Sequence, residues 1–166
     1  ITQTPAPGTI VGIGTTTITL EANDGTNLSD CDFDIIVEDS ALPTAICQDI
    51  TVQLDAAGMA VITAIDVDNG SFDNCMGGIT YSIDVDTFDC SNVGPNNVVL
   101  TITDASGNSS SCNAVVTIED TVLPMVSCID ITVVLDGSGM ASIVPADVNG
   151  GATDACGVDT ISIDID

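Results

Sequence analysis

Apolar and polar residues alternate along several short stretches of this chain. Because successive side chains of a strand point to opposite faces, this period of two predicts half-buried β-strands. Most of the intervening positions are polar, with Thr, Asp, Gln and Asn on the opposite face, and no segment has a sustained helical period. The sequence therefore predicts an all-β chain. The predicted inward positions are Ile50, Val52 and Leu54; Ile79, Tyr81, Ile83 and Val85; Val98, Leu100 and Ile102; and Ala114, Val116 and Ile118.

The chain also repeats itself. The segment 43–75 aligns without a gap with the segment 124–156, at an offset of 81, and 17 of these 33 positions are identical. The same offset relates Cys31 to Cys112 and Pro43 to Pro124. Proline cannot continue a strand ladder, so Pro43 and Pro124 mark the expected seams. Several short strands in each period predict tandem Ig-like β-sandwich repeats with a period of 81.

These seams divide the chain into three parts. We expect residues 1–42 to be the C-terminal part of one Ig-like repeat, residues 43–123 to be a complete repeat, and residues 124–166 to be the N-terminal part of the next. We expect the chain to be a window of a longer polypeptide. The alternative is a filament in which the trailing part of one chain completes the leading part of the next by strand addition.

The charge and composition of the chain exclude several classes of function. It has no Lys, Arg or His and carries 25 acidic residues, for a formal charge of -25. Nucleic-acid binding requires basic side chains, so we expect no nucleic-acid partner. Histidine-based catalysis is impossible. No apolar run reaches about 18 residues, so we expect no membrane insertion. A carboxylate-pair glycosidase is disfavoured, because the chain has only three Glu and two of them, Glu38 and Glu119, recur at repeat boundaries, where catalytic residues rarely repeat. We therefore expect no enzyme.

Cysteine is a fixed feature of the repeat. The seven cysteines are Cys31, Cys47, Cys75, Cys90, Cys112, Cys128 and Cys156, and a spacing of 16 followed by a spacing of 28 occurs twice. There is no CxxC spacing and no His, which favours structural disulfides over a thiolate metal site. Disulfides in turn predict an oxidising, extracellular location.

The four cysteines of the complete repeat allow three connectivities. Cys47 precedes the first strand and Cys112 opens the last, and these strands are commonly close in such sandwiches. We therefore expect a Cys47–Cys112 disulfide, which leaves Cys75–Cys90 to close a local loop. The remaining cysteines are expected to pair with residues outside this segment or with another copy; they are Cys31, Cys128 and Cys156.

A further pattern resembles a known family. Asp104-Ala-Ser-Gly-Asn108, Cys112, Thr117-Ile-Glu-Asp120, Pro124 and Cys128 are similar to the hyalin repeat, an Ig-like module of tandem arrays in very large secreted proteins of Bacteroidetes-type bacteria. The resemblance covers essentially the whole chain and implies adhesion or extracellular scaffolding. The first, partial repeat lacks a cysteine equivalent to Cys90 near Thr9.

Two recurring acidic clusters are candidate Ca²⁺ sites, because Ca²⁺ takes six to eight oxygen ligands at about 2.3–2.6 Å. The first cluster holds Asp66, Asp68 and Asp73, with Asp147 and Asp154 as its counterparts. The second lies at the repeat junctions and holds Glu38, Asp39, Asp104, Asn108, Glu119 and Asp120. The alternative is that both clusters are solvated turns, since Asp, Asn and Gly favour turns.

Three short motifs are candidate modification sites. Ser40, Thr121 and Thr160 each follow an Asp and precede a small apolar residue, which resembles the O-glycosylation motif of Bacteroidetes-type bacteria. We expect the chain to be an extracellular structural protein that forms a stalk, surface fibre or filament, with neighbouring repeats or other copies of itself as partners. The alternative is an adhesin or a carbohydrate-binding segment that recognises surface glycans.

Overall fold

The computed structural model describes residues 1–75 and 77–164. Its regular structure is almost entirely β, which confirms the all-β prediction. The chain divides into two compact units. The first comprises Ile1–Thr44, Ile102–Ser110 and the described part of Phe72–Thr80; the second comprises Ala45–Ser71, Tyr81–Thr101 and the described part of Ser111–Asp166.

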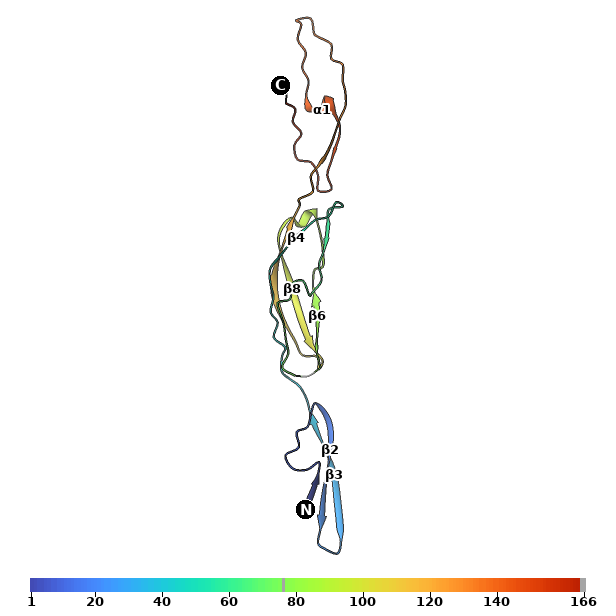
Figure 1. Cartoon of the computed structure of the whole chain (residues 1–166), viewed down its shortest axis with the longest axis vertical. Helices are drawn as coiled ribbons and strands as arrows, with labels where there is room; N and C mark the ends of the chain where they lie inside the picture. The colour runs from blue at the N-terminus through green and yellow to red at the C-terminus, as the bar shows by residue number, and fades with distance from the viewer. Residues whose placement is uncertain (76, 165–166) are drawn as a thin grey trace. The chain divides into compact units, whose positions relative to one another are not determined.

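The N-terminal part of the first unit is a three-stranded antiparallel sheet, ordered β1-β2-β3 (Figure 1). Its strands are β1 (Thr2–Thr4), β2 (Gly14–Asn23) and β3 (Leu28–Val37). Ile18 lies opposite Phe33, and on the other face the hydroxyl of Thr17 donates to Asp34 Oδ1 at 2.7 Å. The β2–β3 hairpin therefore has one apolar and one polar face, as the alternating sequence requires.

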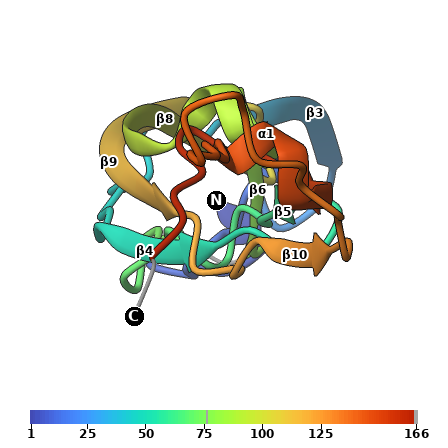
Figure 2. The same ribbon diagram turned by 90° about the horizontal axis from the view of Figure 1, so that it is seen from above.

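The remaining elements follow in chain order. They are β4 (Ile50–Gln53), β5 (Met59–Val61), β6 (Ile79–Ile83), β7 (Thr87–Asp89), the 3₁₀ turn η1 (Cys90–Asn92), β8 (Gly94–Asp104), β9 (Ser109–Glu119), β10 (Met125–Cys128), α1 (Pro145–Val148) and β11 (Asn149–Thr153). β4, β9, β8 and β6 form a four-stranded sheet in that order, and β5–β7 and β10–β11 form two-stranded sheets. Figure 2 shows β4, β9, β8 and β5 from the end.

β4 joins its sheet as a parallel neighbour of β9. Ile50 lies opposite Val116, and Val52 lies opposite Ile118. The pairing continues past both ends of β4, since the Val115 amide donates to Asp49 Oδ1 at 2.7 Å and the Leu54 amide donates to the Glu119 carbonyl at 2.9 Å. A four-residue strand is thereby held over a longer stretch than its own backbone ladder.

The buried core confirms the alternation read from the sequence in β8 and β9. The predicted inward residues of these strands are almost completely buried: Val98, Leu100, Ile102, Ala114, Val116 and Ile118. Val85 was expected to point inward, but this is wrong: β6 ends at Ile83 and Val85 is exposed. Phe88 of β7 and Val67, which lies in a loop, are core residues that the alternation did not predict.

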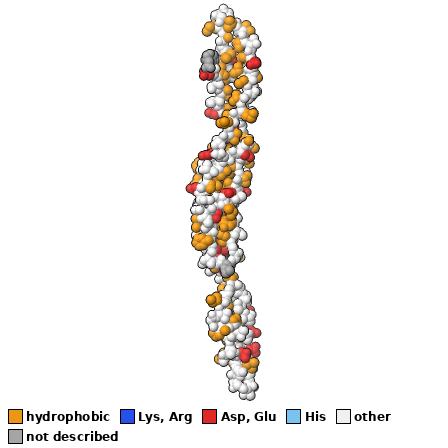
Figure 3. Space-filling view, in the orientation of Figure 1, with side chains coloured by type: hydrophobic (Ala, Val, Ile, Leu, Met, Phe, Trp, Pro, Cys, Tyr) orange, Lys and Arg blue, Asp and Glu red, His pale blue; other side chains and the backbone are white. Residues whose placement is uncertain are grey.

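The C-terminal stretch, residues 124–164, has little regular structure. It contains the β10–β11 ribbon and the single turn α1. The Ile129 amide donates to the Val148 carbonyl at 3.0 Å, next to the β10–β11 ribbon. Residues 130–144 contain no strand, and they form a turn in which the Asp136 amide donates to the Met140 carbonyl at 2.7 Å. Many apolar side chains of this stretch are exposed, as Figure 3 shows for the face in view.

Candidate functional site

Two disulfides cross-link the second unit. Cys47 and Cys112 are bonded, as expected from the proximity of the first and last strands, and their Cα atoms are 5.9 Å apart. The expected Cys75–Cys90 pairing is wrong, because Cys90 is bonded to Cys156, and the latter was expected to pair outside the segment. Cys75–Cys90 was expected because it remained once Cys47 and Cys112 were paired within residues 43–123, whereas the fold brings η1 beside residues 155–156.

The contact between η1 and residues 155–156 is tight. A Cβ atom built on Gly58 would lie 2.8 Å from the Cys90 sulfur and 3.2 Å from the Ala155 Cβ, and Gly58 has a φ of 74°. Glycine is required here on both counts, since a left-handed φ and a close neighbour each disfavour a side chain. Two disulfides indicate an oxidising compartment, which agrees with the expected location outside the cell. Among the residues that the structure describes, no helix is long and apolar enough to span a membrane.

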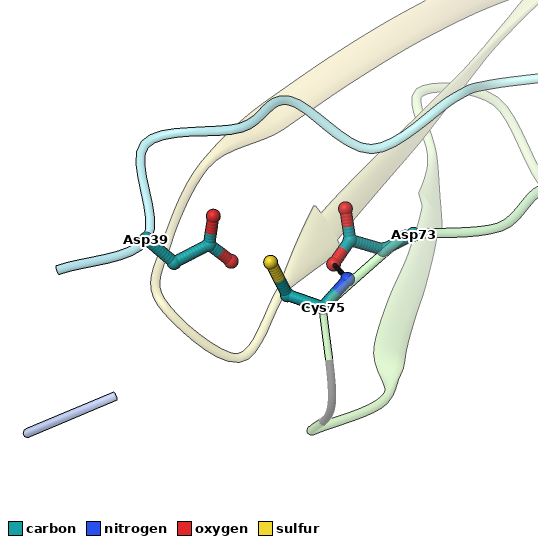
Figure 4. A group of neighbouring side chains, drawn as sticks. All are labelled: Asp39, Asp73 and Cys75. Carbon is teal, nitrogen blue, oxygen red and sulfur yellow. Dashed lines mark hydrogen bonds between the residues drawn. The ribbon is translucent and has the colours of Figure 1, made fainter. Parts of the chain in front are cut away.

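A cluster in the first unit brings together Asp39, Asp73 and Cys75. One ligand atom from each lies within 4.8 Å of the others. Figure 4 shows the Cys75 sulfur pointing toward the Asp39 carboxylate, with the Asp73 carboxylate on its other side. Asp73 Oδ2 accepts a hydrogen bond from the Cys75 amide at 2.8 Å, whereas Asp73 Oδ1 is buried and has no partner. An unpaired buried carboxylate oxygen is costly unless a cation or a proton meets it.

The electrostatics of this cluster favour oxygen over sulfur as a ligand. A hydrogen bond to Asp39 raises the pKa of the Cys75 thiol, and burial together with the charges of Asp39, Asp73 and Asp104 raises it further. The thiol therefore stays protonated at neutral pH, and a protonated thiol is a poor metal ligand. The two carboxylates remain, and they are hard ligands suited to Ca²⁺ rather than to a transition metal.

Asp104 and Asn108 adjoin this cluster. The Asn108 amide side chain donates to the Asp39 carbonyl at 3.1 Å and to Asp104 Oδ2 at 2.9 Å. Burial raises the pKa of Asp104, but hydrogen bonds from Asn108, Ser106 and Gly107 outweigh it, so the net pKa is lowered. Asp104 is thus satisfied as an anion by the turn that it caps, and Asn108 ties this turn to the backbone at Asp39.

A matching cluster lies in the second unit. Asp120, Asp154 and Cys156 also bring one ligand atom each within 4.8 Å. Asp154 Oδ1 accepts from the Cys156 amide at 2.8 Å, and Asp154 Oδ2 is buried without a partner. The sulfur of Cys156 is bonded to Cys90, so only the carboxylates could hold a cation.

The sequence placed these aspartates in different clusters. It grouped Asp73 with Asp66 and Asp68, and Asp39 with the junction, whereas the structure brings Asp39 to Asp73. The two lie far apart along the chain, so local patterns cannot show this contact. The one available signal was that both positions recur one repeat period later, as Asp120 and Asp154.

The other candidate ligands lie apart from these clusters or cap turns. Asp66 Oδ2 accepts from the Thr63 amide and hydroxyl, and these bonds lower its pKa. Asp68 accepts from two backbone amides of its own turn. Asp147 Oδ2 accepts a hydrogen bond from the backbone amide of residue 144. The side chains of Glu38 and Glu119 are exposed.

The candidate glycosylation sites are accessible. Ser40, Thr121 and Thr160 are all exposed, as an acceptor hydroxyl must be. Thr121 also donates a hydrogen bond to Gln53 Oε1 at 3.2 Å, which a glycan on its oxygen would replace.

The comparisons with known proteins give little. No protein-family model matches the chain, and no curated protein matches it. Among solved structures, it is similar to an endo-fucoidan hydrolase of glycoside hydrolase family 107, with a TM-score of 0.35 and 14% sequence identity. The likeness covers 69% of this chain and 21% of that one. At this TM-score it carries no argument about fold or activity.

Proposed function

We propose that the chain is an extracellular structural protein built from tandem Ig-like repeats with a period of 81, which form a stalk, fibre or filament. The observation that carries the proposal is the recurrence of local structure at that offset. We refer to residues 43–123 as the complete repeat and to residues 124–164 as the tail segment.

The first recurrence is in strand pairing. In the complete repeat, Thr44 bridges Phe72 and Cys47 bridges Asp68, both antiparallel. In the tail segment, β10 pairs with β11, so that Met125 lies opposite Thr153 and Cys128 lies opposite Asn149. Each tail residue is 81 positions beyond its counterpart. The same pairing register at an offset of 81 residues supports the same fold in the complete repeat and in the tail segment.

The second recurrence is in the turn that follows. Asp55 Oδ1 accepts from the Ala57 and Met59 amides at 2.8 and 3.0 Å. Asp136 Oδ1 accepts from the amides of residues 138 and 140, at 2.8 and 2.9 Å. An aspartate side chain therefore closes the same turn in both places, as expected if the two backbones have the same geometry.

The disulfides have two separate roles in this arrangement. Cys47–Cys112 ties the start of the complete repeat to its last strand, β9. Cys90–Cys156 ties the complete repeat to the tail segment. The Cys47–Cys112 link resists unfolding within one repeat, and the Cys90–Cys156 link crosses the junction at Pro124 and resists mechanical separation of the two segments. Both properties suit an extracellular protein that carries mechanical load.

We further propose that Ca²⁺ stabilises the junctions. Asp39 with Asp73, and Asp120 with Asp154, flank Pro43 and Pro124, and each pair contains a buried oxygen without a partner. A chain with a formal charge of -25 and no basic side chain has no internal cation to offset this repulsion. Glycans on Ser40 and Thr121 would shield the same junctions from proteases.

Electron microscopy tests the proposal. Protein that carries this sequence, taken from its native source and negatively stained, should show rods or fibres with a regular axial repeat. Within the fibres, the segment with this sequence should stay uncut by trypsin, because it offers no Lys or Arg, and the fibres should fray on reduction. Isolated globules in the native material, before any reductant is added, would contradict the structural role.

A further inference from the structure

We propose that the tail segment of one copy of the chain completes the β2–β3 hairpin of a second copy, and that Cys128 then forms a disulfide with Cys31 of that second copy. The inference rests on the proposed repeat and adds the partner, the register and the covalent link. It follows from what each part of the chain leaves exposed.

The β2–β3 hairpin has the geometry of the β8–β9 hairpin of the complete repeat. In the first, Asp24 Oδ1 accepts from the amides of Thr26 and Asn27, at 2.8 and 2.6 Å. In the second, Asp104 Oδ1 accepts from the amides of residues 106 and 108, at 2.9 and 2.8 Å. The first turn is one residue shorter, but an aspartate closes both hairpins in the same way.

The difference between the hairpins lies in what covers them. Phe33 and Ile35 of β3 are 45% and 38% exposed, whereas their counterparts one repeat period later, Ala114 and Val116 of β9, are completely buried. In the complete repeat, residues 45–71 belong to the same compact unit as Ala114 and Val116 and contribute the buried side chains Leu54, Ala60, Ile62 and Val67. The apolar face of β3 is therefore the half of a core whose other half is a segment like residues 45–71.

The tail segment is such a segment. Leu135 is 63% exposed, while its counterpart Leu54 is 4% exposed. Exposed apolar side chains run along the whole stretch: Met125, Val126, Ile129, Ile131, Val133, Val134, Leu135, Met140 and Val144. Burying a side chain of this size is worth about 1.5–3 kcal/mol, so several together supply a strong drive to associate.

The backbone pairing can be specified. β3 lies at the edge of its sheet, just as β9 would without β4. Transferring the observed β4–β9 register to the equivalent segments places Ile131 of one copy opposite Ile35 of the other, and Val133 opposite Val37, in a parallel ladder. Residues 131–134 have the sequence Ile-Thr-Val-Val and residues 50–53 have Ile-Thr-Val-Gln, so the added strand has the same alternation.

The cysteines mark the same register independently of the strands. Cys31 and Cys128 are both free and exposed. They occupy the positions of Cys112 and Cys47, which form a disulfide in the complete repeat. When the two copies pair as described, two thiols form one disulfide, and two electrons and two protons pass to an oxidant such as oxygen or a disulfide exchange protein.

Non-reducing electrophoresis of the purified chain after air oxidation tests the inference, with Cys75→Ala present throughout to remove the third free thiol. This background should give a ladder of covalent multimers. Cys31→Ser alone and Cys128→Ser alone should give monomer, since neither cysteine pairs with its own kind. Mixing these two variants should give a dimer and nothing larger.

A matched pair of variants tests the register. Val133→Asp should abolish the ladder, because this side chain faces the shared core. Thr132→Asp should leave it intact, because the equivalent Thr51 is exposed. Neither position belongs to a paired strand in the single chain, so both variants keep its fold.

Two results would overturn the inference: a folded chain that stays monomeric in the Cys75→Ala background, or a ladder that survives Cys31→Ser. If the chain stays monomeric while the native material still shows fibres, the proposed function stands and the repeats are joined differently, either at another surface or within one longer polypeptide. If the native fibres are also absent, both proposals fail.

Discussion

Leu54 and Leu135 provide a matched pair of substitutions. They lie one repeat period apart in nearly identical sequences, but Leu54 is 4% exposed and Leu135 is 63% exposed. Leu54→Ala removes an almost fully buried side chain and leaves a cavity against β9, which costs about 2–5 kcal/mol. Leu135→Ala removes a side chain that is about one-third buried, which costs about 0.5–1 kcal/mol from lost burial alone.

Urea denaturation followed by the fluorescence of Tyr81 measures the difference. Tyr81 is the one tyrosine and lies in β6, so it reports on the sheet that Leu54 packs beside. The experiment uses the Cys31→Ser/Cys128→Ser background, which keeps the chain from forming covalent multimers. Leu54→Ala should lower the urea midpoint clearly, and Leu135→Ala should leave it nearly unchanged.

The result that would refute the reasoning is an equal effect of the two substitutions in this background. It would mean that the tail segment already has a closed core within a single chain. In the background that retains Cys31 and Cys128, we expect Leu135→Ala to weaken the ladder of multimers. A Leu135→Met control, which keeps the apolar volume, should preserve that ladder.

Three further predictions concern the Cys90–Cys156 disulfide, the turn closed by Asp104 and the proposed Ca²⁺. Replacing Cys90 and Cys156 together by Ala opens a loop of 66 residues and should cost about 4 kcal/mol of unfolding free energy by the loop-entropy relation, seen as a lower melting temperature. The pKa of Asp104 is lowered in the folded chain, so its contribution to stability is complete above the ordinary aspartate pKa of about 3.9 and is lost as pH falls below it. Asp104→Asn should flatten this part of the stability profile, and an unchanged profile would contradict the assignment. Added Ca²⁺ should raise the melting temperature and a chelator should reverse the rise; Asp73→Asn should reduce the shift and Asp66→Asn should not, so equal shifts in both variants would rule out the Asp73 cluster.

The strands of the central sheet could be predicted because each obeys a local rule. Val98, Leu100 and Ile102 occupy every second position of β8, and the structure buries all three. Val85 continued such an alternation in the sequence but is exposed, because the strand ends at Ile83. Phe88 sits in a three-residue strand, which is too short for a period to be recognised.

The candidate site could be predicted only in part, for a different reason. The sequence shows that its residues are acidic and recur one period apart, but their partners depend on the path of the chain rather than on spacing. Asp39 meets Asp73, and Cys90 meets Cys156, although neither pair is close in the sequence. Cys75 was expected to be the partner of Cys90 because only these two cysteines remained within residues 43–123, whereas the folded chain places Cys156 beside Cys90.

The most direct test of a covalently stapled array is to map the disulfides of the non-reduced chain. Trypsin cannot cut it, but a protease that cleaves before Asp separates every cysteine of interest. Mass spectrometry should find residues 39–48 linked to 104–119, and residues 89–103 linked to 154–158, which correspond to Cys47–Cys112 and Cys90–Cys156. Residues 73–83 linked to 89–103 would instead show Cys75 bonded to Cys90, and the disulfide between neighbouring repeats would be disproved.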